Sequence, residues 1–195
     1  MQRVFDRFIN SLTESFPLNE EEILFLKKSI PIKKLKRGEY LLVEGEISKS
    51  FFYNISGFVR LFYLSDGEER TAFFYPEGKF IGAYDSFRNQ KPSNFFFQAV
   101  EDTEVAIFNY EVAEKMLVVH PNFEKLARLV MEEELMNLQE MVSSLITLSP
   151  EKRYVQLMQK NPGIFNKVPQ IQIASYIGVK PESLSRIKKR VHNHL

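Results

Sequence analysis

The chain has 195 residues, of which 44% are hydrophobic and 26% charged, as in an ordinary globular protein of one or two small domains. It contains no cysteine, which excludes disulfides, thiolate zinc sites, cysteine-ligated iron–sulfur clusters and a cysteine nucleophile. No run approaches the roughly 18 apolar residues of a membrane span, and the N-terminal segment lacks the basic-then-apolar layout of a secretion signal. We therefore expect a cytoplasmic protein.

The net charge of +1 hides an uneven distribution of charge along the chain. Residues 1–150 hold 17 Lys and Arg against 23 Asp and Glu, whereas residues 151–195 hold nine against two, a surplus of seven positive charges. A basic segment behind an acidic one predicts an anionic partner, either nucleic acid or a membrane surface. A solvated, lysine-rich helix would give the same composition, so charge alone leaves both interpretations open.

Two helices are predicted at the N-terminus. Apolar residues recur at helical spacing from Phe5 to Phe16, and Pro17 ends the pattern. Asn19 is a typical N-cap for a second, short helix, because the three glutamates that follow it favour the positive end of a helix dipole.

Between residues 36 and 110 the sequence changes to short runs rich in Phe, Tyr, Val and Ile. Glycine, aspartate or proline separates most of these runs, which are YLLVEG, FFYNISG, FVRLFYL, RTAFFYPEG, NFFFQAVE and TEVAIFNY. Many short strands at such spacing predict an all-β sandwich or barrel. Asp66 and Gly67, between two aromatic runs, predict a tight hairpin.

A long helix is predicted over residues 122–148. Apolar residues at alternating spacings of four and three form the seam of a coiled coil, namely Met131, Leu135, Leu138, Val142 and Leu145. This seam predicts a homodimer, although a single core helix would also explain it. Ser149 as N-cap and Pro150 at the first helical position then begin a new helix where the charge changes sign. The predicted domains are residues 1–121, 122–148 and 149–195.

The strongest local signal is the segment 168–190, with the sequence VPQIQIASYIGVKPESLSRIKKR. A helix-turn-helix needs a small residue where its two helices touch, a glycine at the turn and apolar residues on the facing sides. Ala174 and Gly178 occupy the first two kinds of position. The positions that we expect to be buried hold Ile173, Ile177, Val179, Leu184 and Ile187.

The second helix of this motif, beginning at Pro181, carries side chains suited to reading DNA. Arg186 can bind guanine O6 and N7, Glu182 can accept from cytosine N4, and serine and lysine suit phosphate oxygens. The predicted DNA-binding residues are Gln170, Lys180, Glu182, Ser183, Ser185, Arg186, Lys189 and Arg190. The plainer interpretation of Glu182 and Arg186 is an i,i+4 surface ion pair.

Over nearly its whole length the chain resembles the Crp/Fnr superfamily of bacterial transcription regulators, in the branch common in Bacteroidetes. The segments that look like the glycine-punctuated cyclic-nucleotide-binding jelly roll are RGEYLLVEGE (37–46), FFYNISGFVRLFYL (51–64) and PEGKFIGAYDSF (76–87), and PESLSRIKK (181–189) looks like the recognition helix. The resemblance implies an α+β fold with an N-terminal jelly-roll β-barrel, a long dimerisation helix and a C-terminal helix-turn-helix domain. It implies double-stranded DNA, a second copy of the chain, RNA polymerase and a small-molecule effector as partners.

The chain departs from this family at the ligand pocket. Cyclic-nucleotide binders carry a Gly-Glu pair for the ribose and an Arg-Ser or Arg-Thr pair for the phosphate, but these positions fall on Gly82–Ala83 and about Ser93–Asn94. Because burying a phosphate without a cation costs several kcal/mol, cyclic AMP is not expected to bind in the usual way. The remaining pocket candidates are Phe80, Gly82, Ala83, Tyr84, Arg88, Ser93 and Asn94. Aromatic residues here would either line a cavity for a hydrophobic effector or fill the barrel interior.

No glycine-rich phosphate loop, nucleophile elbow or HExxH motif indicates catalysis. His120, beside Pro121, is interpreted as a turn residue rather than a haem ligand, and His192 and His194 make only a weak metal pair. We therefore expect a homodimeric, sequence-specific transcription regulator that is no enzyme and carries no cofactor. The alternative is a ligand- or protein-binding module with vestigial DNA binding, because the pocket is altered and Lys180 stands where a helix-capping Ser or Thr is usual.

Overall fold

The computed structural model describes residues 2–193, with side chains as far as Val191, so the side chain of His192 and the whole of His194 lie outside it. The chain falls into two compact units. The first comprises Met1–Arg60 and Phe74–Met131, and the second comprises Leu61–Phe73 and Glu132–Leu195. None of the described helices is long and apolar enough to cross a membrane.

The first unit opens with α1 (Gln2–Ser15) and α2 (Glu20–Ser29), as the sequence predicts. Asn19 caps α2 in a reciprocal arrangement. Its Oδ1 accepts from the backbone N–H of Glu22 at 2.9 Å, and the Glu22 carboxylate accepts from the backbone N–H of Asn19 at 2.8 Å. The prediction of an N-cap at Asn19 is confirmed, because two otherwise orphaned donors are satisfied there.

The strands form two four-stranded sheets with the orders β1-β8-β3-β6 and β2-β7-β4-β5. Their bounds are β1 Ile32–Leu35, β2 Tyr40–Leu42, β3 Ser50–Ser56, β4 Val59–Ser65, β5 Glu68–Tyr75, β6 Phe80–Ile81, β7 Phe96–Ala99 and β8 Thr103–Asn109. Between β4 and β5, Asp66 and Gly67 both have positive φ, at 54° and 77°, as a tight hairpin turn requires. The predicted jelly-roll barrel and its hairpin are confirmed.

Two helices were not predicted. Helix α3 (Tyr84–Asn89) lies between β6 and β7, and α4 (Tyr110–Val119) follows β8. The expectation of an all-β segment over residues 36–110 was wrong at α3, because six residues are too few to establish a helical period. The start of α4 does carry a local signal. The Asn109 side chain accepts from the backbone N–H of Val112 at 2.8 Å, which is N-cap geometry.

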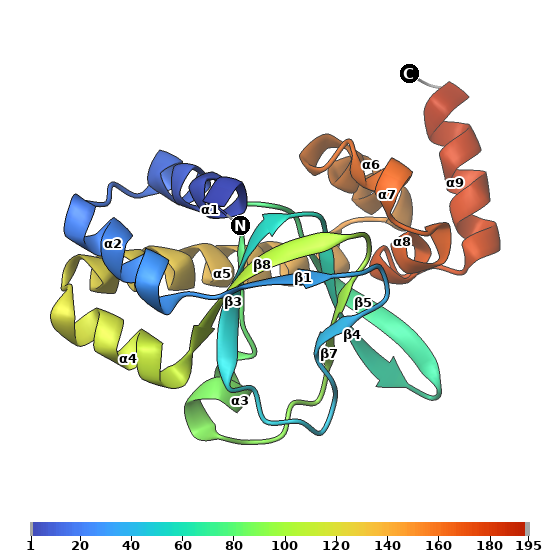
Figure 1. Cartoon of the computed structure of the whole chain (residues 1–195). Coiled ribbons are helices and arrows are strands. Elements are labelled where there is room, and N and C mark those ends of the chain that lie inside the picture. The colour runs from blue at the N-terminus through green and yellow to red at the C-terminus, as the bar shows by residue number, and fades with distance from the viewer. Residues whose placement is uncertain (1, 194–195) are drawn as a thin grey trace. The chain divides into compact units, whose positions relative to one another are not determined.

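The main hydrophobic core joins the helices of this unit to the sheet β1-β8-β3-β6. Figure 1 shows α1, α2 and α4 gathered beside this sheet. Phe8 of α1, Leu26 of α2 and Phe123 at the start of α5 are buried in one cluster with Tyr53 of β3 and Phe108 of β8. Because the apolar stripe of α1 faces this cluster, the N-terminal helix is an integral part of the first unit.

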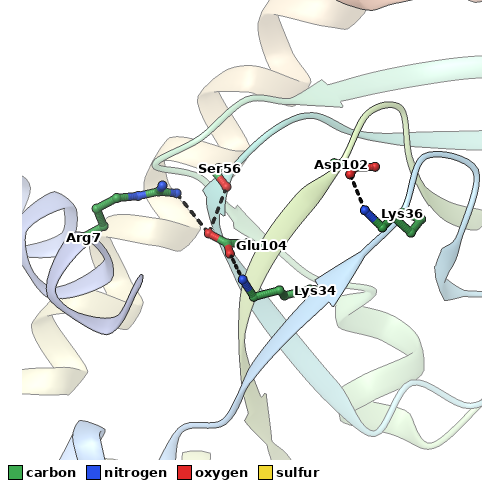
Figure 2. A network of polar contacts seen from close by, with 6 residues as sticks. All are labelled: Arg7, Lys34, Lys36, Ser56, Asp102 and Glu104. Atoms are coloured by element: carbon green, nitrogen blue, oxygen red, sulfur yellow. Dashed lines mark hydrogen bonds and ion pairs between the residues drawn. The ribbon is translucent and has the colours of Figure 1, made fainter. Parts of the chain in front are cut away.

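A polar network fastens α1 and β1 to the same sheet (Figure 2). Glu104 of β8 accepts from Arg7 of α1 at 3.2 Å and pairs with Lys34 of β1 at 2.8 Å. Nearby, the hydrogen bond from Lys36 lowers the pKa of the Asp102 carboxyl, and the same bond raises the pKa of Lys36. Apart from Glu104, whose side chain is 17% exposed, these groups are largely exposed, so the network orients surface elements and adds little stability.

The second unit is helical apart from residues 61–73. Its helices are the C-terminal part of α5 (Asn122–Thr147), then α6 (Pro150–Lys160), α7 (Ile164–Lys167), α8 (Gln170–Tyr176) and α9 (Pro181–Asn193). Ser149 caps α6 by accepting from the backbone N–H of Lys152 at 3.4 Å, and Pro150 follows it, so this predicted helix start is confirmed. The compact units divide within α5, and the domain boundary at Ser149 stays a prediction.

Candidate nucleic-acid interface

The turn between α8 and α9 is closed by backbone hydrogen bonds around a left-handed glycine. Gly178 has a φ of 73°, its N–H donates to the Ser175 carbonyl at 3.0 Å, and the Val179 N–H donates to the Ala174 carbonyl at 2.9 Å. This is a Schellman motif, in which the last carbonyls of a helix are satisfied by the residues of the turn. A side chain with a Cβ would be strained at Gly178, which explains a glycine at this position.

The facing sides of the two helices form a small apolar core. Ala174 and Ile177 are fully buried, and Ile173, Leu184 and Ile187 are at most 4% exposed. Val179 was predicted to be buried as well, and that expectation was wrong, since Val179 is only half-buried. It lies in the turn between the helices, so one side of it remains accessible to solvent.

Arg153 of α6, which no sequence pattern singles out, holds the end of α8 in place. Its Nε and Nη2 both donate to the Ile177 carbonyl, at 3.0 and 2.9 Å, and its Nη1 donates to the Leu148 carbonyl at 2.7 Å. One guanidinium therefore ties the helix-turn-helix to the end of α5. An arginine in a basic segment gives no sign in the sequence that its partners are backbone carbonyls.

The predicted DNA-binding residues lie outside this core. Exposed side chains belong to Gln170, Lys180, Glu182, Ser185, Arg186, Lys189 and Arg190, whereas Ser183 is half-buried. Arg190 pairs with Glu151 of α6, with Nε and Oε1 3.2 Å apart, and the Ser185 hydroxyl donates to the Pro181 carbonyl at 3.3 Å. The ion pairs recorded among the described residues do not join Glu182 to Arg186. Arg186 thus projects from α9 with its five N–H donors available to an acceptor such as a base edge.

The pocket candidates of the segment 80–84 are closely packed. A Cβ placed on Gly82 would lie 3.1 Å from two ring atoms of Tyr84 and 3.5 Å from Cβ of Phe51. Ala83, at the position of the missing carboxylate, is 1% exposed. The ring of Phe80 packs against Phe51, Tyr53 and Phe108, with ring centroids 4.9–6.1 Å apart. These rings belong to the core that the sheet β1-β8-β3-β6 forms with α1 and α2, so Phe80 packs on the helix-facing side of the sheet, and the filling of the barrel interior by aromatic residues stays a prediction.

The loop that would hold a phosphate is occupied by internal hydrogen bonds. The Ser93 hydroxyl donates to the Phe95 carbonyl at 2.9 Å and accepts from the Phe95 N–H at 3.2 Å. Ser93 is 5% exposed, while Arg88 and Asn94 are exposed to solvent. The described contacts bring Gly82 and Tyr84 together and place Phe80 in the core with α1, whereas the cation Arg88 lies exposed at the surface.

Among the side chains that the structure describes, no three of His, Cys, Asp or Glu come together as a metal site. His120 instead contacts two rings edge-on, Phe25 at 5.1 Å and Phe123 at 5.9 Å between centroids. Its role in the structure is packing at the junction of α4 and α5.

Comparison with known proteins agrees with this architecture. Residues 32–120 match the family of the cyclic nucleotide-binding domain. The chain is 26% identical over 200 residues to the anaerobic regulatory protein of Pasteurella multocida, covering 95% of this chain and 72% of that protein. It is 24% identical over 170 residues to the transcriptional activator protein Anr of Pseudomonas protegens, covering 81% and 69%. The structure of FixK2 from Bradyrhizobium japonicum superimposes with a TM-score of 0.72 at 16% identity, covering 85% of each chain.

The β-barrel is thus a domain of the cyclic nucleotide-binding type, joined to a helix-turn-helix. The chain's homologues and structural neighbours are regulators of the Crp/Fnr type. The predicted resemblance to Crp/Fnr regulators is confirmed, whereas the branch common in Bacteroidetes stays a prediction. The predicted fold class, an α+β chain with a jelly-roll barrel, a long helix and C-terminal helices, is confirmed.

Proposed function

We propose that the chain is a sequence-specific, DNA-binding transcription regulator that acts as a homodimer in the cytoplasm. The observation that carries this proposal is the closed helix-turn-helix, whose second helix leaves Glu182, Arg186 and Lys189 exposed on a segment with seven surplus positive charges. Helix α9 enters the major groove of double-stranded DNA, where Arg186 and Glu182 contact base edges. Lys180, Lys189 and Gln170 contact phosphates.

The dimer forms through the predicted seam of α5. Met131, Leu135 and Leu138 are 43%, 57% and 40% exposed in the single chain, and Val142 and Leu145 are 50% and 51% exposed. An apolar stripe this exposed favours a partner helix over solvent. Residues 122–148 then act as the dimerisation helix between a sensor domain, 1–121, and a DNA-binding domain, 149–195.

The regulator works without catalysis and without a resident cofactor, and responds to an effector other than cyclic AMP. The support is the chemistry of the pocket region, where Ala83 and Ser93 replace the two groups that would bind a cyclic nucleotide. RNA polymerase is a further partner of such a regulator. An effector that binds the barrel changes the affinity for DNA only if it binds two conformations of the dimer with different affinities.

Selection of random DNA duplexes on the purified protein tests this proposal. The expected product is an inverted repeat with half-sites about one helical turn, roughly 34 Å, apart. Such a repeat, recovered without added ligand, would establish a dimer that binds DNA in its apo form. Recovery of only salt-sensitive background, both from the protein alone and with cell extract added, would contradict the proposal and favour a binding module with vestigial DNA binding.

A further inference from the structure

The hairpin formed by the outer ends of β4 and β5 belongs to the same compact unit as the DNA-binding helices. Residues 61–73 group with residues 132–195, apart from the rest of the barrel. Because the hairpin continues directly into β4 and β5, the chain has a second route, besides α5, from the barrel to the helix-turn-helix.

One side chain of α8 makes the contact with this hairpin. The Ser175 hydroxyl accepts from the Thr71 N–H at 2.9 Å and donates to the Glu69 carbonyl at 2.9 Å. The carbonyl of one strand residue and the N–H of the residue two further on point to the same side of the strand. Since β5 is the last strand of its sheet, Ser175 binds at a strand edge where a neighbouring strand is missing.

The docked hairpin leaves the proposed DNA-binding face open. Ser175 lies in the last turn of α8, whereas Gln170 begins that helix and is exposed. Arg186 and Lys189 on α9 are exposed in the same arrangement. The contact therefore orients the motif without covering it.

We infer that Ser175 is a positioning residue that fixes the orientation of the helix-turn-helix against the β4–β5 hairpin. Through this orientation it sets the spacing of the two α9 helices in the dimer, although it does not itself touch DNA. The inference rests on the proposed function, because spacing matters only where two recognition helices bind successive major grooves.

The test compares Ser175→Ala and Ser175→Thr with the unaltered full-length chain. The control is Ser65→Ala, which removes an exposed hydroxyl from the other strand of the hairpin. Binding is measured to the selected repeat and to repeats whose spacer is one base pair longer or shorter. We expect Ser175→Ala to bind the best spacing about fivefold more weakly, because two hydrogen bonds that hold the helices are lost.

The spacing profile distinguishes positioning from a merely structural role. Ser175→Ala should also lose most of its discrimination between spacers, Ser175→Thr should restore it, and the Thr71 amide should exchange hydrogen faster in the alanine variant. An equal loss at every spacing, or an unchanged profile, would overturn the inference while leaving the proposed function intact. Failure of the unaltered chain to bind any repeat would overturn the proposed function, and the inference with it.

Discussion

At the scale of single residues, the roles proposed for two cations of α9 can be separated by experiment. Arg186 offers a planar fork that matches two acceptors on guanine, whereas Lys189 offers a point charge to a phosphate. We expect Arg186→Ala to cost about 1–3 kcal/mol of specific binding and to relax base preference at one position in each half-site. Quantitative binding to the selected repeat and its single-base variants measures this.

Lys189→Ala is the matched comparison. It should weaken binding to all sequences alike and lower the slope of log affinity against log salt by about one per subunit. Should both variants lose affinity equally and without regard to sequence, direct readout by Arg186 would be wrong.

A second residue-scale prediction concerns Arg153, which joins the ends of α5 and α8 through three hydrogen bonds to backbone carbonyls. Bonds from a charged donor contribute more than neutral ones, and their loss leaves part-buried carbonyls without a partner. We expect Arg153→Ala to destabilise the helical unit by about 2 kcal/mol. Urea unfolding monitored by circular dichroism measures the loss, with the exposed Lys152→Ala as control. Equal stability of the two variants would show that the bonds are replaced by water.

These two residues also show what sequence can predict at this scale. The exposure of Arg186 was predictable, because its position in the helix-turn-helix pattern places its side chain outside the apolar core. Arg153 was not, because its partners are the main chain of residues 24 positions ahead and five behind. A hydrogen bond to a backbone carbonyl requires no particular side chain at the accepting residue, so the sequence does not reveal the partner.

At the scale of elements, the seam of α5 is the feature with the sharpest consequence. A lysine in place of Leu138 would put a charge into the apolar stripe at the centre of the predicted dimer. Burying that charge without a partner costs several kcal/mol, so we expect Leu138→Lys to be monomeric at micromolar concentration. Sedimentation velocity distinguishes the two states.

The control for the seam is Asn137→Lys, which adds the same charge at an exposed neighbouring position outside the apolar stripe. It should leave the dimer unchanged. A dimeric Leu138→Lys chain with normal DNA binding would contradict the assignment of the interface to this stripe.

Whether a helix or strand could be predicted depended on its length and on the capping or turn residues at its ends. Helix α5 has 26 residues, long enough to establish its period, and its predicted bounds differ from the observed ones by one residue. Helix α3 has six residues and no N-cap hydrogen bond from a side chain, so neither period nor cap marked it. Six of the eight strands lie in the predicted runs, because glycine, aspartate or proline stands between most of those runs, whereas β1 and β6 are short and were missed.

At the scale of the whole molecule, the grouping of the β4–β5 hairpin with the DNA-binding helices was beyond prediction. Ser175 lies 104 residues from Thr71, and serine is an ordinary residue in either element. The long-range contact joins a hydroxyl to main-chain groups, and such a contact cannot be predicted from a pattern of side chains. The uneven charge of the chain, in contrast, was readable from composition and points to an anionic partner.

The last prediction concerns the effector and spans the whole regulator. Cyclic AMP carries a buried negative charge in the usual site, but the family resemblance puts about Ser93 where the arginine would stand. The Ser93 hydroxyl is hydrogen-bonded to Phe95, and the ring of Tyr84 lies against Gly82. Placing the phosphate there would cost several kcal/mol of solvation with no cation to offset it. We expect calorimetric titration with cyclic AMP to give no saturable heat, and cyclic AMP to leave affinity for the selected repeat unchanged. Saturable binding at micromolar concentration would contradict this expectation and would make the chain a candidate cyclic-nucleotide-responsive regulator, with Arg88 and Lys91 the first cations to substitute.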